Sequence, residues 1–128
     1  MRLLLDTHAL IWWLAGDRTL PDRAIKAIDD AANEVIVSAV SAFEVSTKYR
    51  LGKLPEAADL AQDFEAARER QGFKPLSISI VHAARAGALA GIHKDPFDRL
   101  LVAQALTENL ILVSNEVLFD QFGVSRLW

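Results

Sequence analysis

Short apolar runs alternate along the chain with longer segments of helical periodicity. The short runs have the length and β-branched content typical of buried strands, and they span 3–5, 35–37, 74–78 and 110–113, with a weaker one at 124–127. The longer segments predict helices over 8–15, 21–33, 41–51, 56–71, 79–89 and 95–106, and a helical turn near 116–119. Strands that alternate with helices indicate an α/β fold with a mainly parallel sheet of four to five strands, covered by helices on both faces.

Composition and length are those of an ordinary globular protein. The 128 residues suit a single domain spanning 1–128, and 52% hydrophobic with 24% charged residues excludes a disordered chain. The absence of cysteine excludes disulfides, thiolate metal sites and thiol nucleophiles, and it fits a cytoplasmic location. The basic start and apolar run imitate a signal peptide, but Asp6 and His8 interrupt that run, so we expect neither export nor a membrane span.

Five carboxylates lie in four segments, close to strand ends or helix starts. Asp6 follows the first strand, and Glu44 lies in the expected first turn of the helix after the second strand. Asp95 and Asp98 open the helix before the fourth strand, and Glu116 follows that strand. Because ligands of an open parallel sheet bind at the carboxyl ends of its strands, we expect these side chains to converge there.

Capping and pairing within helices also explain each acid taken singly. The candidates are an N-cap at Asp6, a capping box of Ser41 with Glu44, a cap of Asp95 with Asp98, and pairs of Glu44 with Lys48 and Asp95 with Arg99. Acids that only cap need not all lie at one end of a sheet, however. Converging carboxylates repel one another and call for a cation, and oxygen ligands favour Mg²⁺ or Mn²⁺ over zinc.

The order of the motifs resembles a known family over essentially the whole chain, from Asp6 to Trp128. The segments are LLLDTHALIWWL, SAFEV, HKDPFDRLLVAQAL and LILVSNEVLFDQFGV. Together they resemble the PIN-domain ribonucleases, and specifically the VapC toxins of type II toxin–antitoxin systems. The resemblance implies a three-layer α/β/α sandwich that holds Mg²⁺ or Mn²⁺ in a cluster of acids and cleaves RNA endonucleolytically.

By this resemblance Asp6, Glu44 and Asp98 match the three core acids, which are expected to hold the metal and to be catalytic. Asp95 in the same DPFDR segment is expected to be auxiliary. Glu116 stands where the family usually has an aspartate in a T-x-D pattern. Its extra methylene leaves direct coordination and a water-mediated contact as alternatives.

The resemblance also implies the reaction and the partners. A metal-activated water is expected to hydrolyse RNA phosphodiester bonds. The expected partners are RNA, a cognate VapB-type antitoxin and a second copy in a homodimer, with no membrane. The alternative is a catalytically inactive PIN-fold module that binds RNA or protein. A receiver domain is disfavoured, because only one acid follows the first strand and serine ends the third.

Polar residues beside the acids have two open interpretations. Thr7 or Ser114 is expected either to cap a helix or to hydrogen-bond a carboxylate or phosphate. The neighbouring bases are either RNA phosphate contacts or a solvated face; they are Lys48, Arg50, Lys53, His93, Lys94 and Arg99. The formal charge of −3 counts against a broad electrostatic nucleic-acid binder, but it arises largely from acids at the expected site.

Overall fold

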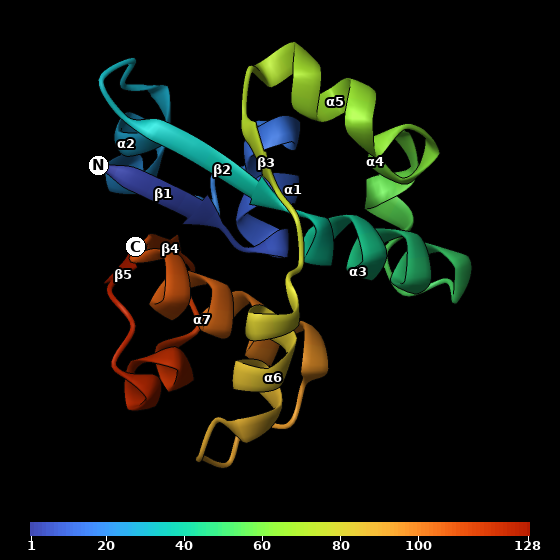
Figure 1. The fold of residues 1–128 in the computed structure, drawn as a ribbon. Coiled ribbons are helices and arrows are strands. Elements are labelled where there is room, and N and C mark those ends of the chain that lie inside the picture. Colours follow the sequence, from blue (N-terminus) through green and yellow to red (C-terminus); the bar gives the residue numbers. More distant parts are fainter.

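Five strands form one sheet in the order β3-β2-β1-β4-β5 in the computed structural model, which describes residues 1–128 (Figure 1). The strands are β1 (Arg2–Leu5), β2 (Glu34–Ser38), β3 (Lys74–Leu76), β4 (Ile111–Val113) and β5 (Arg126–Leu127). Every neighbouring pair is parallel, with Leu3 opposite Val35 and Leu5 opposite Val113. The predicted parallel sheet is therefore confirmed.

Helices connect the strands and cover both faces of the sheet. They are α1 (Thr7–Ala15), α2 (Asp22–Asp29), α3 (Ala39–Arg50), α4 (Ala58–Gln62), α5 (Phe64–Gln71), α6 (Ile80–Ala88) and α7 (Pro96–Glu108), with 3-10 helices η1 (Pro55–Ala57) and η2 (Val117–Phe122). None of these helices is long and apolar enough to cross a membrane.

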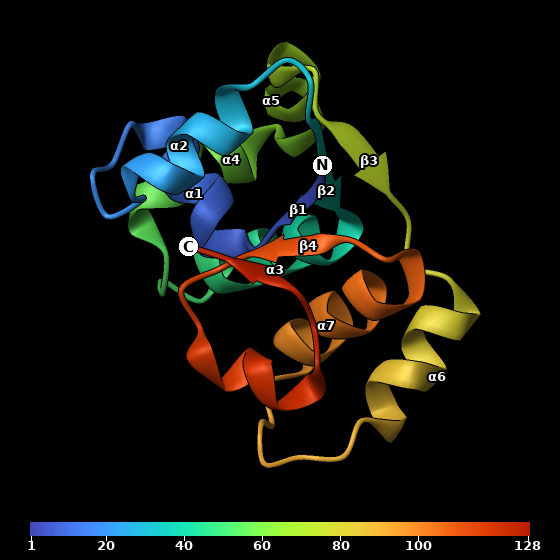
Figure 2. The same cartoon turned by 90° about the vertical axis from the view of Figure 1, so that its left-hand side faces the viewer.

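Two hydrophobic cores lie on opposite faces of the sheet. Leu3 and Leu5 of β1 join the core that includes α1 and α2, whereas Leu4 joins the core that includes α7. This alternation follows from the two-residue period of a strand. Figure 2 shows the resulting layers, with α1 and α2 on one side of the sheet and α7 and α6 on the other. The predicted α/β/α sandwich is confirmed.

Two predicted helices are shorter than the apolar pattern indicated. The helix expected over 21–33 ends at Asp29, because Asp30 is extended and the Asn33 side chain donates to the Ala27 carbonyl 2.9 Å away. The segment 56–71 is not one helix: it breaks at Asp63, whose side chain accepts from the Ala66 N–H and starts α5. Both breaks arise from side chains that compete for main-chain hydrogen bonds.

A buried glutamine connects α7 to the sheet. Gln104 is fully buried; its Oε1 accepts from Ser38 Oγ at 2.5 Å, and its Nε2 donates to the Ser77 carbonyl at 3.2 Å. Ser38 ends β2 and Ser77 follows β3. These bonds fix α7, and with it Asp98, relative to the carboxyl edge of the sheet.

Candidate metal centre at the carboxyl edge of the sheet

A polar cavity of about 330 Å³ lies where β1 and β4 end. The chain passes from β1 to β2 and β3 on one side and returns to β4 on the other, so a crevice forms between β1 and β4. The cavity is lined mostly by polar side chains: Asp6, Thr7, His8, Trp12, Glu44, Lys48, Asp95, Asp98, Asn115, Glu116 and Phe119. All five carboxylates singled out from the sequence therefore face one cavity.

Asp6 enters the cavity directly from the end of β1. Its main-chain N–H donates to the Val113 carbonyl of β4 at 3.1 Å, and its Oδ1 accepts from the Ala9 N–H at 2.8 Å. It therefore caps α1 as well as lining the cavity. Burial raises the pKa of Asp6 to about 6, although hydrogen bonds from Ser114 and Ala9 oppose that rise. The fold thus holds this carboxylate where its charge is costly.

Glu44 lies in the second turn of α3, not in the first. The helix begins at Ala39, and the Ser38 hydroxyl caps it by accepting from the Val40 N–H. The predicted capping box of Ser41 with Glu44 is therefore wrong, because strand β2 leads directly into the helix at Ser38.

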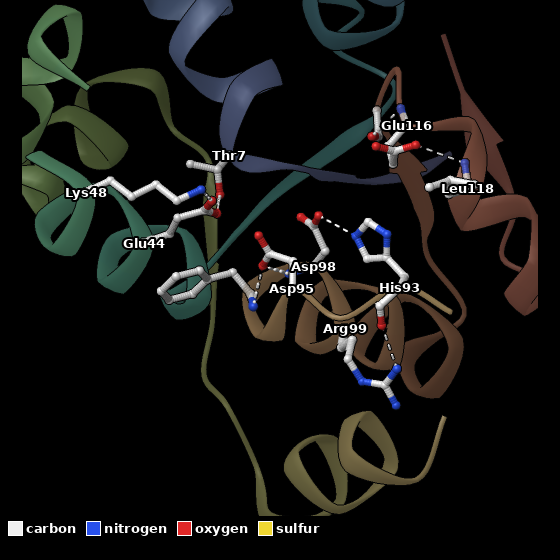
Figure 3. A network of polar contacts seen from close by, with 11 residues as sticks. Thr7, Glu44, Lys48, His93, Asp95, Asp98, Arg99, Glu116 and Leu118 are labelled. Atoms are coloured by element: carbon white, nitrogen blue, oxygen red, sulfur yellow. Dashed lines mark hydrogen bonds and ion pairs between the residues drawn. The ribbon is translucent and has the colours of Figure 1, made fainter. Parts of the chain in front are cut away.

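The Glu44 carboxylate is 3% exposed and has two partners. The Thr7 hydroxyl donates to Oε1 at 2.5 Å, and the Lys48 ammonium contacts Oε2 at 2.5 Å (Figure 3). The predicted pair with Lys48 is confirmed, and so is a hydrogen bond from Thr7 to a carboxylate. Glu44 is consequently held in one orientation by groups from α1 and α3.

Asp95 and Asp98 have different roles at the start of α7. Asp95 Oδ1 accepts from the N–H groups of Phe97 at 2.8 Å and Asp98 at 3.1 Å, so it caps the helix. Asp98 Oδ2 lies 2.7 Å from His93 Nε2. Burial raises the pKa of Asp98, the His93 hydrogen bond lowers it, and the charges of Asp95 and Glu44 raise it further.

The predicted pair of Asp95 with Arg99 is wrong. The Arg99 guanidinium donates instead to main-chain carbonyls of the segment before α7, including those of Ala86 at 3.0 Å and His93 at 2.9 Å. Of the bases considered as RNA contacts, Lys48 lines the cavity, whereas Arg99 and His93 are engaged by the protein itself.

Glu116 lines the far side of the cavity and caps η2. Its Oε1 accepts from the Leu118 N–H at 3.0 Å, and Figure 3 shows the side chain turned toward Leu118, apart from Asp98. This orientation keeps the Glu116 carboxylate apart from Asp98 and Glu44.

The donor chemistry of the cavity fits a hard divalent cation. Carboxylate oxygens are the preferred protein ligands of Mg²⁺ and Mn²⁺, and a bound cation would offset the repulsion that raises the pKa of Asp98. In the present arrangement no three of these side chains lie close enough together to hold one ion. Glu44 faces Lys48 and Asp98 faces His93, so both carboxylates already have a partner within the chain.

Three aromatic rings at the cavity were not assigned to it from the sequence. Trp12 and Phe119 line it, and Phe97 lies beneath the Lys48 ammonium with its centroid 5.7 Å from Nζ. The only sequence signal for Phe97 was its position next to Asp98. Apolar residues within helices are ordinarily assigned to the core, which is why they were overlooked.

The PIN domain family model matches residues 3–124 of the chain. Ribonuclease VapC22 of Mycobacterium tuberculosis is 30% identical over 115 residues, which cover 89% of this chain and 86% of that protein. Ribonuclease VapC16 of the same organism is 39% identical over 71 residues. The match to VapC16 covers 56% of this chain and 49% of VapC16, about half of that relative's length.

Solved structures with the same fold include two VapBC structures. VapBC2 from Rickettsia felis, bound to a DNA fragment from its promoter, superposes with a TM-score of 0.66 at 17% identity, covering 99% of this chain and 98% of that one. VapBC-1 from nontypeable Haemophilus influenzae superposes with a TM-score of 0.68 at 17% identity, and the match covers 99% of this chain and 97% of that one. At these identities the likeness is one of fold.

Proposed function

The chain belongs to the PIN-domain family, and we propose that it is an endoribonuclease dependent on Mg²⁺ or Mn²⁺ and the toxin of a VapBC-type toxin–antitoxin pair. The observation that carries this proposal is the convergence of five carboxylates, from four segments of the chain, on one cavity at the crevice between β1 and β4. The ribonuclease names of two relatives support RNA as the substrate.

Asp6, Glu44 and Asp98 are the proposed ligands and catalytic acids, with Glu116 and Asp95 as auxiliary oxygen donors beside them. When bound, a divalent cation of this kind activates a water molecule and neutralises charge on the phosphate. The chain itself holds these carboxylates at one cavity, and binding of the ion requires Glu44 and Asp98 to turn from Lys48 and His93 toward it.

Each core acid has its own positioning group. The Asp6 main chain is bonded to β4, the Thr7 hydroxyl orients Glu44, and the cap that Asp95 provides fixes the helical turn that carries Asp98. Lys48 supplies the ammonium of the cavity and is available to a phosphate once Glu44 has another cation.

The proposed protein partners have separate surfaces. A cavity of about 400 Å³ between α1 and α4–α5, lined by six hydrophobic residues, Leu14 and Leu60 among them, and by four polar or charged ones, suits an amphipathic segment of an antitoxin. Ile80 and Val81, which are 88% and 61% exposed at the start of α6, suit contact with a second copy of the chain. Leu14→Asp is expected to abolish a complex with the antitoxin encoded beside this chain while leaving RNA cleavage intact.

A cleavage assay on labelled single-stranded RNA tests the enzymatic proposal. The purified chain is expected to cut RNA internally with Mg²⁺ or Mn²⁺ and to stop when EDTA is added. Asp6→Asn and Asp98→Asn are each expected to remove the activity, whereas Glu69→Gln, at an exposed acid on α5, is expected to keep it. A parent chain that binds Mn²⁺ without cutting RNA would instead be the inactive binding module.

A further inference from the structure

Two phenylalanines lie beside the cavity, each one residue before a core acid. Phe43 precedes Glu44 on α3, and Phe97 precedes Asp98 on α7. Their ring centroids are 5.5 Å apart with an interplanar angle of 78°, so the rings meet edge to face between the two helices. Phe43 is 61% exposed, although Glu44 next to it is 3% exposed. A large apolar ring therefore faces solvent against Phe97, which itself lies under the cavity-lining Lys48.

Lys48 connects this aromatic pair to the acids. Its ammonium lies 5.7 Å from the centroid of Phe97 and at the same time contacts Glu44 Oε2. The rings, an ammonium and the carboxylates thus form one continuous surface that runs from α7 and α3 into the cavity. An interface between two protein copies ordinarily has few charges at its centre, whereas this surface is charged at its centre and apolar at its edge.

The combination has the chemistry that binds single-stranded RNA. Unpaired bases stack on aromatic side chains, and basic residues next to those rings contact the phosphates. We propose that Phe43 and Phe97 form a nucleobase-stacking subsite, and that Lys48 contacts the phosphate between the stacked nucleotide and the one at the carboxylates. This inference rests on the proposed function in one respect, that the substrate is RNA.

The subsite selects unpaired RNA. A base inside a duplex is already stacked on its neighbours and does not present a free face to Phe43. Because every base has such a face, stacking at Phe43 contributes affinity with little dependence on sequence. We therefore expect the chain to bind a single strand or a loop more tightly than a duplex of the same sequence.

Binding is measured by fluorescence anisotropy of a labelled single-stranded oligoribonucleotide at low salt, once in EDTA and once in Mn²⁺ with Asp98→Asn added to every protein compared, so that no cleavage occurs and Glu44 has a cation other than Lys48 in the second series. Phe43→Ala is expected to raise Kd about tenfold, as for the loss of one base–aromatic stack. Phe43→Trp retains a stacking face and is expected to restore the affinity. Tyr49→Ala, at another exposed aromatic of α3, is the matched control and is expected to bind as the parent does.

Abasic nucleotides, placed one at a time along the oligonucleotide, locate the stacked base. The parent is expected to lose affinity at one position, and Phe43→Ala is expected to be indifferent to that same position. Equal Kd values for the parent and Phe43→Ala, or a parent that does not bind RNA, would overturn the subsite. Sedimentation that shows Phe43→Ala dissociating a dimer, with RNA binding unchanged, would assign the ring to a contact between copies instead.

The failure of this subsite and the failure of the nuclease proposal are distinguishable. A chain that binds RNA through Phe43 but does not cut it in Mn²⁺ keeps the subsite and lacks the nuclease activity. A chain that cuts RNA with the same KM before and after Phe43→Ala keeps the activity and lacks the subsite.

Discussion

His93 Nε2 lies 2.7 Å from Asp98 Oδ2, and this contact joins the segment before α7 to the first turn of that helix. His93 is held in turn at two points: its imidazole meets the Phe119 ring edge to face, with centroids 5.6 Å apart, and its main-chain carbonyl accepts from Arg99. His93 therefore orients Asp98, and Arg99 in turn fixes His93.

His93→Ala is expected to weaken Mn²⁺ binding by about tenfold, the usual cost of removing a hydrogen-bond partner of a metal ligand. The contact orients the Asp98 carboxylate and lowers its pKa, so its loss leaves Asp98 less ordered and less readily ionised. Calorimetric titration with Mn²⁺ provides the measurement. His93→Gln, which keeps a side-chain donor, is expected to recover part of the affinity. Equal affinities for His93→Ala and the parent would contradict this role.

Arg99→Lys is expected to loosen the segment 89–95 without unfolding the chain. The guanidinium bonds several carbonyls at once, among them those of Ala86, Leu89 and His93, and a single ammonium cannot reproduce that geometry. Hydrogen exchange of the Leu89 and Ile92 amides, which donate to the Arg85 carbonyl and to Gln121 Oε1, should therefore accelerate, by an amount corresponding to about 1–2 kcal/mol. Arg85→Lys, at a more exposed arginine of α6, is the control. Unchanged exchange of these two amides would show that other contacts hold the segment.

Asp6→Asn is expected to stabilise the metal-free protein at neutral pH. The pKa of Asp6 is about 6 in the folded protein and 3.8 in the unfolded chain. Between pH 3.8 and about pH 6 the folded state therefore binds a proton at Asp6 that the unfolded state has lost. Stability is consequently lost as the pH rises from about 4 to 6, and the whole loss is present above pH 6. Asparagine keeps an oxygen for the Ala9 N–H but carries no charge to bury.

Urea unfolding in EDTA measures this effect. The free energy of unfolding of Asp6→Asn is expected to exceed that of the parent by up to about 3 kcal/mol at pH 7.5 and by about 1 kcal/mol at pH 4.5. The same substitution removes a proposed metal ligand, so added Mn²⁺ should stabilise the parent more than the variant. A difference between the two proteins that does not change with pH would contradict the role assigned to burial.

Much of the fold could be predicted from the sequence, because parallel strands bury both faces and read as short apolar runs. The positions of Asp6 and Asp98 could be predicted for a related reason: each lies at a boundary between a strand or loop and a helix, and carboxyl ends of parallel strands gather on one edge. The break at Asp63 could not, since the apolar spacing continues through it.

The partners of the acids were less predictable, because they depend on rotamers and on long-range packing. The pair of Glu44 with Lys48 follows from helical spacing, whereas Arg99 bonds distant carbonyls although the same spacing predicted a pair with Asp95. The sequence could place Glu116 at the cavity, but not the orientation of its side chain, because that carboxylate accepts from the Leu118 N–H at the start of η2.

Lys48→Met is expected to make the chain depend on a divalent cation for its stability. Glu44 is buried, and the Lys48 ammonium is the cation that faces its carboxylate in the metal-free protein. Removing one partner of a buried pair leaves an uncompensated charge; because the Lys48 side chain is 25% exposed, we expect a loss of about 1–3 kcal/mol in EDTA. Methionine keeps an unbranched side chain of similar length beside Phe97 but carries no charge.

Added Mn²⁺ is expected to restore more stability to Lys48→Met than it adds to the parent, because the ion then meets a Glu44 carboxylate that no ammonium occupies. Urea unfolding with and without Mn²⁺ gives both values, and Lys48→Arg, which keeps the positive charge, is the control. The difference in unfolding free energy between the two proteins should narrow as the Mn²⁺ concentration rises, since a ligand at free concentration c stabilises the folded state by RT ln(1 + c/Kd), which is larger for the protein that binds it more tightly. A loss of stability in Lys48→Met that Mn²⁺ does not reduce would show that Lys48 acts through packing, and that Glu44 does not hold the ion.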